Sequence, residues 1–192
     1  MSVAEYIASF ISIMIGLSLA DLATSLQRLL RAGKRVRWDI LTPATAILVT
    51  AFVINVWWSL YGALNAMRSL SVAGFVPDLI SLILLFCLTS SALPDDVADG
   101  CDLGEYYRTN RKRFWGLFLI YMLWVTAVIG VRGSLAGGGS ALIGSVVPNL
   151  LLAALMLLLV FTPRRSIHLA VVALLLAVTG FAWLPQQLGR LG

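Results

Sequence analysis

The residue types that carry most metal-binding and catalytic chemistry are scarce in this chain, which has one histidine and two cysteines in 192 residues. Structural zinc sites take four ligands, mainly Cys and His, so these three residues are too few. Cys87 lies in an apolar run and Cys101 in a charged segment, so no disulfide is expected between them. GxSxG, HExxH, P-loop and CxxC motifs are also missing. These absences do not favour an enzyme, and they predict that no cofactor is bound.

Charged residues are also few, at 12% of the chain against 60% hydrophobic residues, and they lie between long apolar runs. There are six such runs, at 6–24, 44–66, 75–93, 114–131, 141–162 and 166–184. A helix rises about 1.5 Å per residue, so runs of about 18–23 residues match a hydrocarbon core of about 30 Å. Lipid offers no partner to backbone N–H and C=O groups, so each run must be helical. The sequence predicts an all-α integral membrane protein, a six-transmembrane-helix bundle forming one domain over residues 1–192.

The cations are placed mainly on one side of the predicted membrane. Eleven of the 14 Lys and Arg residues fall in three of the segments between runs, at 25–43, 94–113 and 163–165. The other three are Arg68, Arg132 and Arg190. Positively charged loops stay in the cytoplasm, so these three segments are predicted to be cytoplasmic and both termini to lie on the other side. The net charge of +5 is then a topology signal, and no nucleic-acid partner is expected.

The first run has small residues at every fourth position, which places them on one helix face. The series is Ala4, Ala8, Ser12, Gly16, Ala20 and Thr24. In a membrane such a groove lets two helix backbones approach closely, because packing drives association there. The groove predicts either packing within one chain or contact with a second copy or a membrane-protein partner.

Polar residues inside the runs give the first candidate site. Asp21 lies near the cytoplasmic end of the first run with Ser18 and Ser25, and Asn55 lies deeper in the second run. An ionisable group inside a membrane is a functional candidate, so these four residues are predicted to line an ion or substrate path. The alternative is that the Asp21 carboxylate pairs with Arg28 or another basic residue of the following segment.

Acidic residues after the third run give a second candidate site. Asp95, Asp96 and Asp99 match the pattern DDxxD, whose carboxylates hold magnesium against a diphosphate in polyprenyl-diphosphate enzymes. A single five-residue match is a weak signal. The alternative is a solvated acidic loop whose carboxylates face the cations Arg108, Arg111, Lys112 and Arg113.

Three local features carry further expectations. The first helix should continue beyond the membrane and stop at Gly33, because Leu residues keep helical spacing up to that point. Pro148-Asn149 should kink or open the fifth helix. His168 opens the sixth run beside Arg164 and Arg165, which favours an interfacial position for its ring.

The stretch SIMIGLSLADLATSLQRLLRAGKRVRWD, together with NVWWSLYG, resembles a group of small multi-pass membrane proteins of bacteria. The resemblance covers mainly the first two helices. It implies a location in the bacterial inner membrane, and it implies neither an activity nor site residues.

Three classes of function are consistent with these observations. The first is a small ion channel or ion-coupled carrier that uses the path residues. The second is an accessory or scaffold protein that packs against membrane proteins, as a homo-oligomer or in a larger complex. The third is a magnesium-dependent enzyme acting on a lipid-linked phosphate through the acidic residues.

Overall fold

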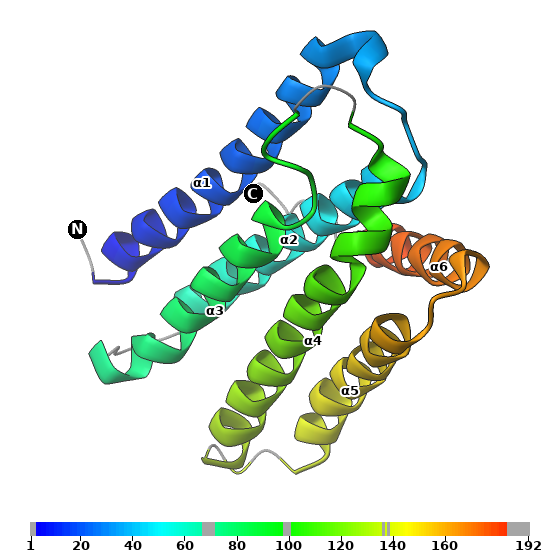
Figure 1. Cartoon of the computed structure of the whole chain (residues 1–192). Helices are drawn as coiled ribbons and strands as arrows, with labels where there is room; N and C mark the ends of the chain where they lie inside the picture. The colour runs from blue at the N-terminus through cyan, green and yellow to red at the C-terminus, as the bar shows by residue number, and fades with distance from the viewer. Residues whose placement is uncertain (1–2, 67–71, 98–100, 136, 138, 184–192) are drawn as a thin grey trace.

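The computed structural model of the chain describes residues 3–66, 72–97, 101–135, 137 and 139–183. Helices account for nearly all of these residues (Figure 1), which confirms the predicted all-helical class and the six long helices. The six are α1 (Val3–Ala32), α2 (Leu41–Ala66), α3 (Val72–Ser90), α4 (Leu103–Leu135), α5 (Gly139–Phe161) and α6 (Arg165–Trp183). A short 3-10 helix, η1 (Gly33–Arg35), follows α1.

The ends of two helices show how local chemistry sets their length. α1 ends at Ala32 and Gly33 has φ +55°, a left-handed conformation that favours glycine, so the predicted helix stop is confirmed. α4 begins at Leu103, well before the expected start at residue 114, so the prediction of a loop over 94–113 is wrong for its second half. The cause is a cap: the Asp102 carboxylate accepts hydrogen bonds from the backbone N–H groups of Gly104 (2.9 Å) and Glu105 (3.1 Å).

The helices form two layers. α1, α3, α4 and α5 lie side by side in that order, and α2 and α6 lie behind them (Figure 1). α2 is the central helix, because it packs against α1, α3, α4 and α6. α5 packs mainly against α4, to which it is joined as a helical hairpin.

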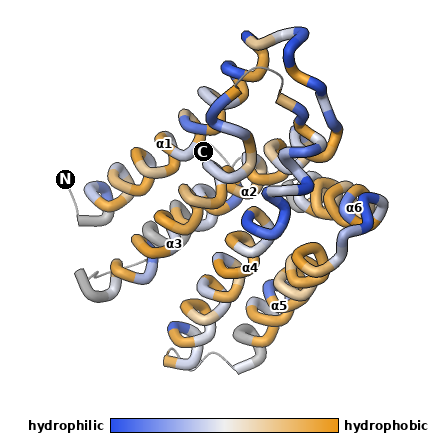
Figure 2. The backbone as a smooth tube through the Cα atoms, in the orientation of Figure 1, coloured by the Kyte–Doolittle hydropathy of each residue, from blue (hydrophilic) through white to orange (hydrophobic). Residues whose placement is uncertain are grey.

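Length and surface chemistry both indicate a membrane protein. Among the described residues, four helices are long and apolar enough to cross a membrane, namely α1, α2, α4 and α5. The apolar stretches of α3 and α6 are shorter, at Gly74–Ser90 and Arg165–Phe181. Apolar residues also cover the outside of the helices, while hydrophilic ones gather at one end (Figure 2). Water would not favour so much exposed apolar surface, whereas lipid does.

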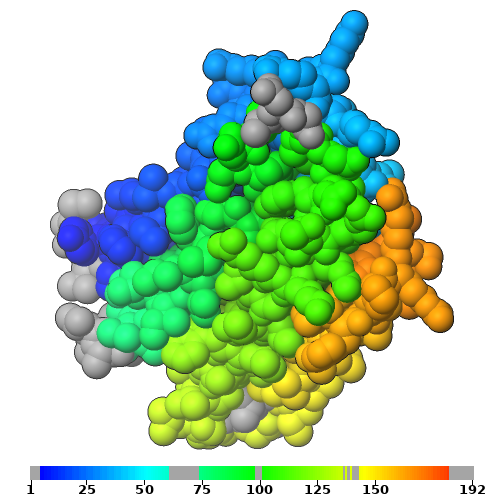
Figure 3. Space-filling view, in the orientation of Figure 1, coloured from blue at the N-terminus to red at the C-terminus, as the bar shows by residue number. Residues whose placement is uncertain are grey.

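The hydrophilic end of the bundle, here called the basic end, contains the last turn of α1 and the first turns of α2, α4 and α6. The segment after α1 lies against the start of α4 there (Figure 3). The Arg37 N–H donates to the Cys101 carbonyl at 2.9 Å, and the Leu103 N–H donates to the Arg37 carbonyl at 3.0 Å. Leu103 is fully buried beneath this contact, so the connections at this end are part of the packed structure.

Candidate polar sites within the helical bundle

A pocket of about 390 Å³ lies among α2, α3, α4 and α5, toward the end opposite the basic end. We call it the amide pocket. Its polar lining consists of Asn55 and Ser59 of α2, Asp78 and Ser81 of α3, Arg132 of α4 and Asn149 of α5. Apolar side chains such as Phe52, Leu82 and Tyr121 form the rest of its wall. A mainly apolar pocket with a few converging polar groups is the usual form of a small-molecule site.

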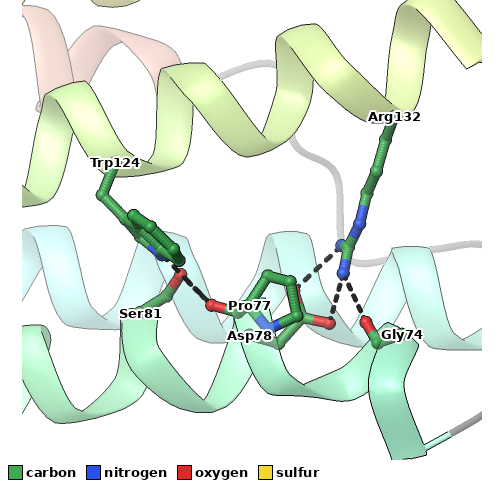
Figure 4. Close-up of polar contacts among 6 residues, drawn as sticks. All are labelled: Gly74, Pro77, Asp78, Ser81, Trp124 and Arg132. Atoms are coloured by element: carbon green, nitrogen blue, oxygen red, sulfur yellow. Dashed lines mark hydrogen bonds and ion pairs between the residues drawn. The ribbon is translucent and has the colours of Figure 1, made fainter.

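An ion pair closes one side of the amide pocket (Figure 4). Arg132 donates from both terminal nitrogens to the Asp78 carboxylate, each at 2.9 Å, and Nη2 also donates to the Gly74 carbonyl at 2.8 Å. The Asp78 side chain is mostly buried, at 13% exposure, and that of Arg132 is 40% exposed. Two parallel hydrogen bonds fix the guanidinium plane against the carboxylate, so the pair joins α3 to α4 in one orientation.

Pro77, next to this ion pair, is a second link between α3 and α4. Its carbonyl accepts hydrogen bonds from Trp124 Nε1 of α4 at 3.2 Å and from Ser81 Oγ at 2.9 Å (Figure 4). Proline has no N–H and therefore interrupts the hydrogen-bond ladder of a helix. Trp124 holds α3 against α4 at this interruption, while the Ser81 bond lies within α3.

The two amides in the pocket have no partner within the described part of the chain. Asn55 and Asn149 are half-buried, and no hydrogen bond joins either side chain to another described residue. Every fully buried side-chain nitrogen or oxygen in the described residues does have a partner. The amide groups of Asn55 and Asn149 are therefore accessible from the pocket, where they can donate to and accept from a bound molecule. Asn149 also follows Pro148, which lies inside α5.

The predicted path residues are divided between two places. Asp21 accepts a hydrogen bond from Ser90 Oγ at 2.5 Å, and Ser25 Oγ donates to Asp95 at 3.0 Å, so both lie where α1 meets the end of α3. Ser18 is buried and donates within its own helix, to the Met14 carbonyl at 3.0 Å. Asn55 lies apart from these three residues, in the amide pocket.

The sequence offered Arg28 as a partner of the Asp21 carboxylate, and the cations of residues 108–113 as partners of the acidic residues after α3. The structure shows other partners in both cases. Arg28 donates to the backbone carbonyl of Asp95 at 2.7 Å, and the hydrogen bond to the Asp21 carboxylate comes from Ser90. A shallow cleft of about 650 Å³ places the carboxylates of Asp95 and Asp96 among three cations of the first segment and not among those of α4. These three cations are Arg28, Arg31 and Arg35.

The described residues hold no cluster suited to a metal. They contain no group of three or more His, Cys, Asp and Glu side chains placed to bind one ion. Asp99, the third residue of the DDxxD pattern, lies outside the described residues. The arginines around Asp95 and Asp96 supply the positive charge that a magnesium ion would supply.

The small-residue groove of α1 faces away from the bundle. Ser12, Gly16 and Ala20 are exposed and Ala8 is half-buried. A Cβ placed on Gly16 would meet no atom within 4 Å. The groove is therefore open at its centre, and packing within this chain does not account for it.

A buried hydrogen-bond chain joins α4 to α6 at the basic end, and sequence reasoning did not find it. Trp115 Nε1 donates to Tyr107 Oη at 2.9 Å, Tyr107 Oη lies 2.6 Å from His168 Nδ1, and His168 Nε2 lies 2.8 Å from the Thr162 carbonyl. His168 lies at the basic end beside Arg165, as expected for an interfacial residue, but it is only 1% exposed, so its ring is enclosed by the helices. The carbonyl can only accept, so Nε2 carries the proton and Nδ1 accepts from Tyr107.

One sequence signal points toward this chain. Tyr107, Arg111 and Trp115 are spaced by four residues and therefore share one face of a helix. Arg111 from that face donates to the Thr162 carbonyl at 2.6 Å, the same carbonyl that His168 contacts. The spacing is informative only if α4 starts at Leu103. The charged composition of residues 103–113 is typical of a loop and hides that start.

Acidic side chains organise the connections around this chain. Asp39 accepts from the Leu41 N–H at 2.9 Å, capping α2, and its other oxygen lies 2.6 Å from Arg165 of α6. The hydrogen bond from the Glu105 N–H, followed by that from Gly104 and the charge of Arg37, lowers the pKa of the Asp102 carboxyl. Burial and the neighbouring Asp102 charge raise the pKa of the Cys101 thiol, which keeps this free cysteine protonated and poorly nucleophilic.

Comparison of the chain with family models, with curated proteins and with solved structures gives no match. The resemblance to small bacterial multi-pass proteins therefore gains no support from them. Any assignment of function rests on the chemistry of the sites described above.

Proposed function

We propose that this protein is a small ion-coupled carrier whose solute site is the amide pocket. The observation that carries the proposal is the pair of half-buried amides, Asn55 and Asn149, which line one pocket from two helices and lack partners among the described residues. An amide without a partner is costly inside a membrane bundle. A small polar solute in the pocket would supply hydrogen bonds to both amides and remove that cost.

The charges of the pocket indicate the class of solute. The carboxylate of Asp78 and the guanidinium of Arg132 neutralise one another, so the pocket has no excess charge of either sign. A neutral or zwitterionic molecule suits such a lining better than a bare ion. The coupling proton or cation would then use Asp21, whose carboxylate lies with Ser90 where α1 meets α3.

Apolar packing favours a carrier over an open channel. Between the amide pocket and Asp21, α2 and α3 present side chains that are at most 1% exposed, namely Val49, Val53, Leu85 and Leu88. Such a packed layer leaves no continuous polar path for an ion. A carrier needs this layer to block leakage, and its helices must shift before the solute can cross.

We propose further that all six helices span the bacterial inner membrane, with the basic end in the cytoplasm and both termini outside. The gathering of cations around Arg28, Arg111 and Arg165 at one end supports this orientation. Two of the three cations expected on the outer side, Arg68 and Arg190, lie outside the described residues.

Labelling of a single cysteine tests the orientation. Lys34→Cys would be introduced into a chain carrying Cys87→Ser and Cys101→Ser, and intact cells would be treated with a membrane-impermeant maleimide. We expect no labelling until the inner membrane is opened. Labelling in intact cells with a permeable outer membrane would reverse the proposed topology.

Flux in sealed liposomes tests the carrier. Purified protein would be reconstituted with a proton, sodium or potassium gradient, and small neutral and zwitterionic solutes would be added one at a time while currents are recorded. We expect one solute to produce a current that protein-free liposomes lack, and Asn55→Ala to reduce it at least about tenfold, because a buried hydrogen bond to the solute is lost.

The matched control is Thr50→Ala, on the same helix, whose hydroxyl bonds only to the Ala46 carbonyl and does not line the pocket. It should carry normal current. Asp21→Asn should abolish coupling to the ion gradient while leaving solute binding intact. Equal currents in the wild type, Asn55→Ala and Asp21→Asn would contradict the proposal.

A second candidate, a scaffold or homo-oligomer assembled through α1, is favoured by the open groove around Gly16. Close helix approach in membranes uses such small-residue faces. Gly16→Leu should abolish association measured by cross-linking in native membranes, while the variant folds normally because a Cβ at this position meets no atom of the described residues within 4 Å. Ile13→Leu, a volume-conserving change at an exposed position of the same helix, is the control. Unchanged cross-linking in Gly16→Leu would remove this candidate.

A further inference from the structure

A second pocket, of about 370 Å³, lies at the basic end among the starts of α2, α4 and α6. We call it the arginine pocket. Its lining includes four arginines, Arg37, Arg108, Arg111 and Arg165. It shares no lining residue with the amide pocket. A ligand here would therefore contact none of the residues of the proposed carrier site.

Three of the four arginines form ion pairs, and a ligand can replace two of them at small cost. Arg37 lies 3.3 Å from Asp102 with 85% of its side chain exposed, and Arg108 lies 2.8 Å from Glu105 with 72% exposed. Arg165 lies 2.6 Å from Asp39, whose side chain is only 11% exposed, so this pair is the firmest of the three. Exposed ion pairs such as those of Arg37 and Arg108 contribute little free energy, so these two guanidinium groups can turn toward a stronger acceptor at small cost.

Arg111 differs from the other three arginines. It makes one hydrogen bond, from Nη1 to the Thr162 carbonyl at 2.6 Å, and no carboxylate of the described residues pairs with it. A guanidinium has five N–H donors, so most of its donor capacity is unused by the described chain. Because the same carbonyl accepts from His168 Nε2, the Thr162 carbonyl and the buried hydrogen-bond chain hold Arg111 in place.

The net charge and the rim of the arginine pocket define its ligand. Four guanidinium groups face three carboxylates, and His168 is neutral, which leaves an excess positive charge that Arg111 carries. A guanidinium binds a phosphate group through two parallel hydrogen bonds. Trp38, Leu41 and Pro163 add an apolar rim, and Trp38 is half exposed, as tryptophans at a membrane surface commonly are.

We infer that the arginine pocket binds a phosphate ester, with Arg111 as the central ligand and Arg108 closing over it. The phosphate belongs either to the headgroup of an anionic phospholipid or to a small soluble ester, which present the same chemistry to the guanidinium groups. Basic pockets between membrane helices are suited to lipid headgroups, because the acyl chains stay in the bilayer beside the rim.

Native mass spectrometry of the whole protein in a neutral detergent tests the inference. Phosphatidylglycerol would be titrated into wild type, Arg111→Gln and the control Arg113→Gln, which removes the same charge from the same helix at an exposed position outside the pocket. We expect Arg111→Gln to weaken lipid retention at least about tenfold, because a charge-assisted hydrogen bond is lost. Arg113→Gln should stay within about twofold of the wild type.

Arg108→Gln is the second pocket variant, because its arginine contacts only exposed Glu105 and its removal does not disturb the Thr162 carbonyl. It should weaken retention about threefold, and it decides the question if Arg111→Gln does not fold. Glycerol 3-phosphate as competitor separates the two sources. Displacement at millimolar concentration assigns a soluble ester, and lipid retention without displacement assigns a headgroup. Equal lipid retention by the control and both pocket variants, or no binding of either probe to the wild type, would overturn the inference.

Discussion

At the basic end, α4 and α6 are joined by a buried chain of neutral hydrogen bonds, whereas at the opposite end α3 and α4 are joined by an ion pair. The neutral chain of Trp115, Tyr107 and His168 is closed to solvent and ends on a carbonyl. The pair of Asp78 and Arg132 is charged and partly exposed, and it borders a pocket. Neutral polar groups can be enclosed at low cost once they are paired, while charges need some contact with water or with one another.

This difference separates a fixed region from an adjustable one. Each atom of the neutral chain has its partner, so no rearrangement improves it. The ion pair lies next to Pro77, where the hydrogen-bond ladder of α3 is interrupted, and next to amides without partners among the described residues. If a solute binds and helices shift, the change belongs at this end and the basic end serves as its frame.

The largest effect is expected from Trp115→Ala. Trp115 is the largest of the side chains that are completely buried, so truncation leaves a cavity and removes the donor to Tyr107. We expect a loss of about 3–5 kcal/mol in the free energy of unfolding, measured by denaturation with sodium dodecyl sulfate from mixed micelles. Trp58→Ala removes an exposed indole of α2 and should cost far less. A similar loss in both variants would show that the basic end is not the more tightly packed frame.

Tyr107→Phe removes one hydroxyl from the neutral chain and keeps the ring. Trp115 Nε1 then loses its acceptor and His168 Nδ1 loses its donor. Two buried groups without partners should lower the unfolding free energy by about 2–3 kcal/mol in the same assay. Tyr6→Phe, at an exposed position of α1, should be neutral. The Tyr107→Phe loss should not depend on salt, because no charge is involved.

Arg132→Gln breaks the ion pair at the opposite end and leaves the mostly buried Asp78 carboxylate without its cation. Because Arg132 is partly exposed, we expect a loss of about 1–2 kcal/mol, less than for a fully buried pair. The loss should shrink at high salt, in contrast to that of Tyr107→Phe. A double-mutant cycle with Asp78→Asn measures the coupling directly. A cycle with no coupling would mean that the two side chains do not stabilise the join between α3 and α4.

The helical class, the six helices and the stop at Gly33 follow from the sequence, because run length and glycine geometry are local properties. The extension of α4 to Leu103 was missed because one carboxylate, Asp102, caps a segment whose charges are typical of a loop. The burial of His168 depends on that extension, since its partner Tyr107 lies within it.

The candidate sites were less predictable than the helices. Asn55 was singled out from the sequence, but its neighbours Asn149 and Asp78 come from other helices, and only tertiary packing brings them to one pocket. One alternative from the sequence paired the acidic residues after α3 with cations of α4, because these follow closely in the chain. In the structure the cations beside Asp95 come from α1 and η1, because the end of α3 meets the last turns of α1.

α4 is a single uninterrupted helix from Leu103 to Leu135, and a helix of this length can carry a movement from one end of the bundle to the other. Arg111 of the arginine pocket and Arg132 of the amide pocket lie on the same rod, about 30 Å apart at the rise of an α-helix. A stiff rod transmits a tilt or a roll applied at one end to the other with little loss. If both pockets bind ligands as proposed, a tilt or roll of α4 at the arginine pocket would also move the lining of the amide pocket, with no chain of intermediate side chains needed to relay it.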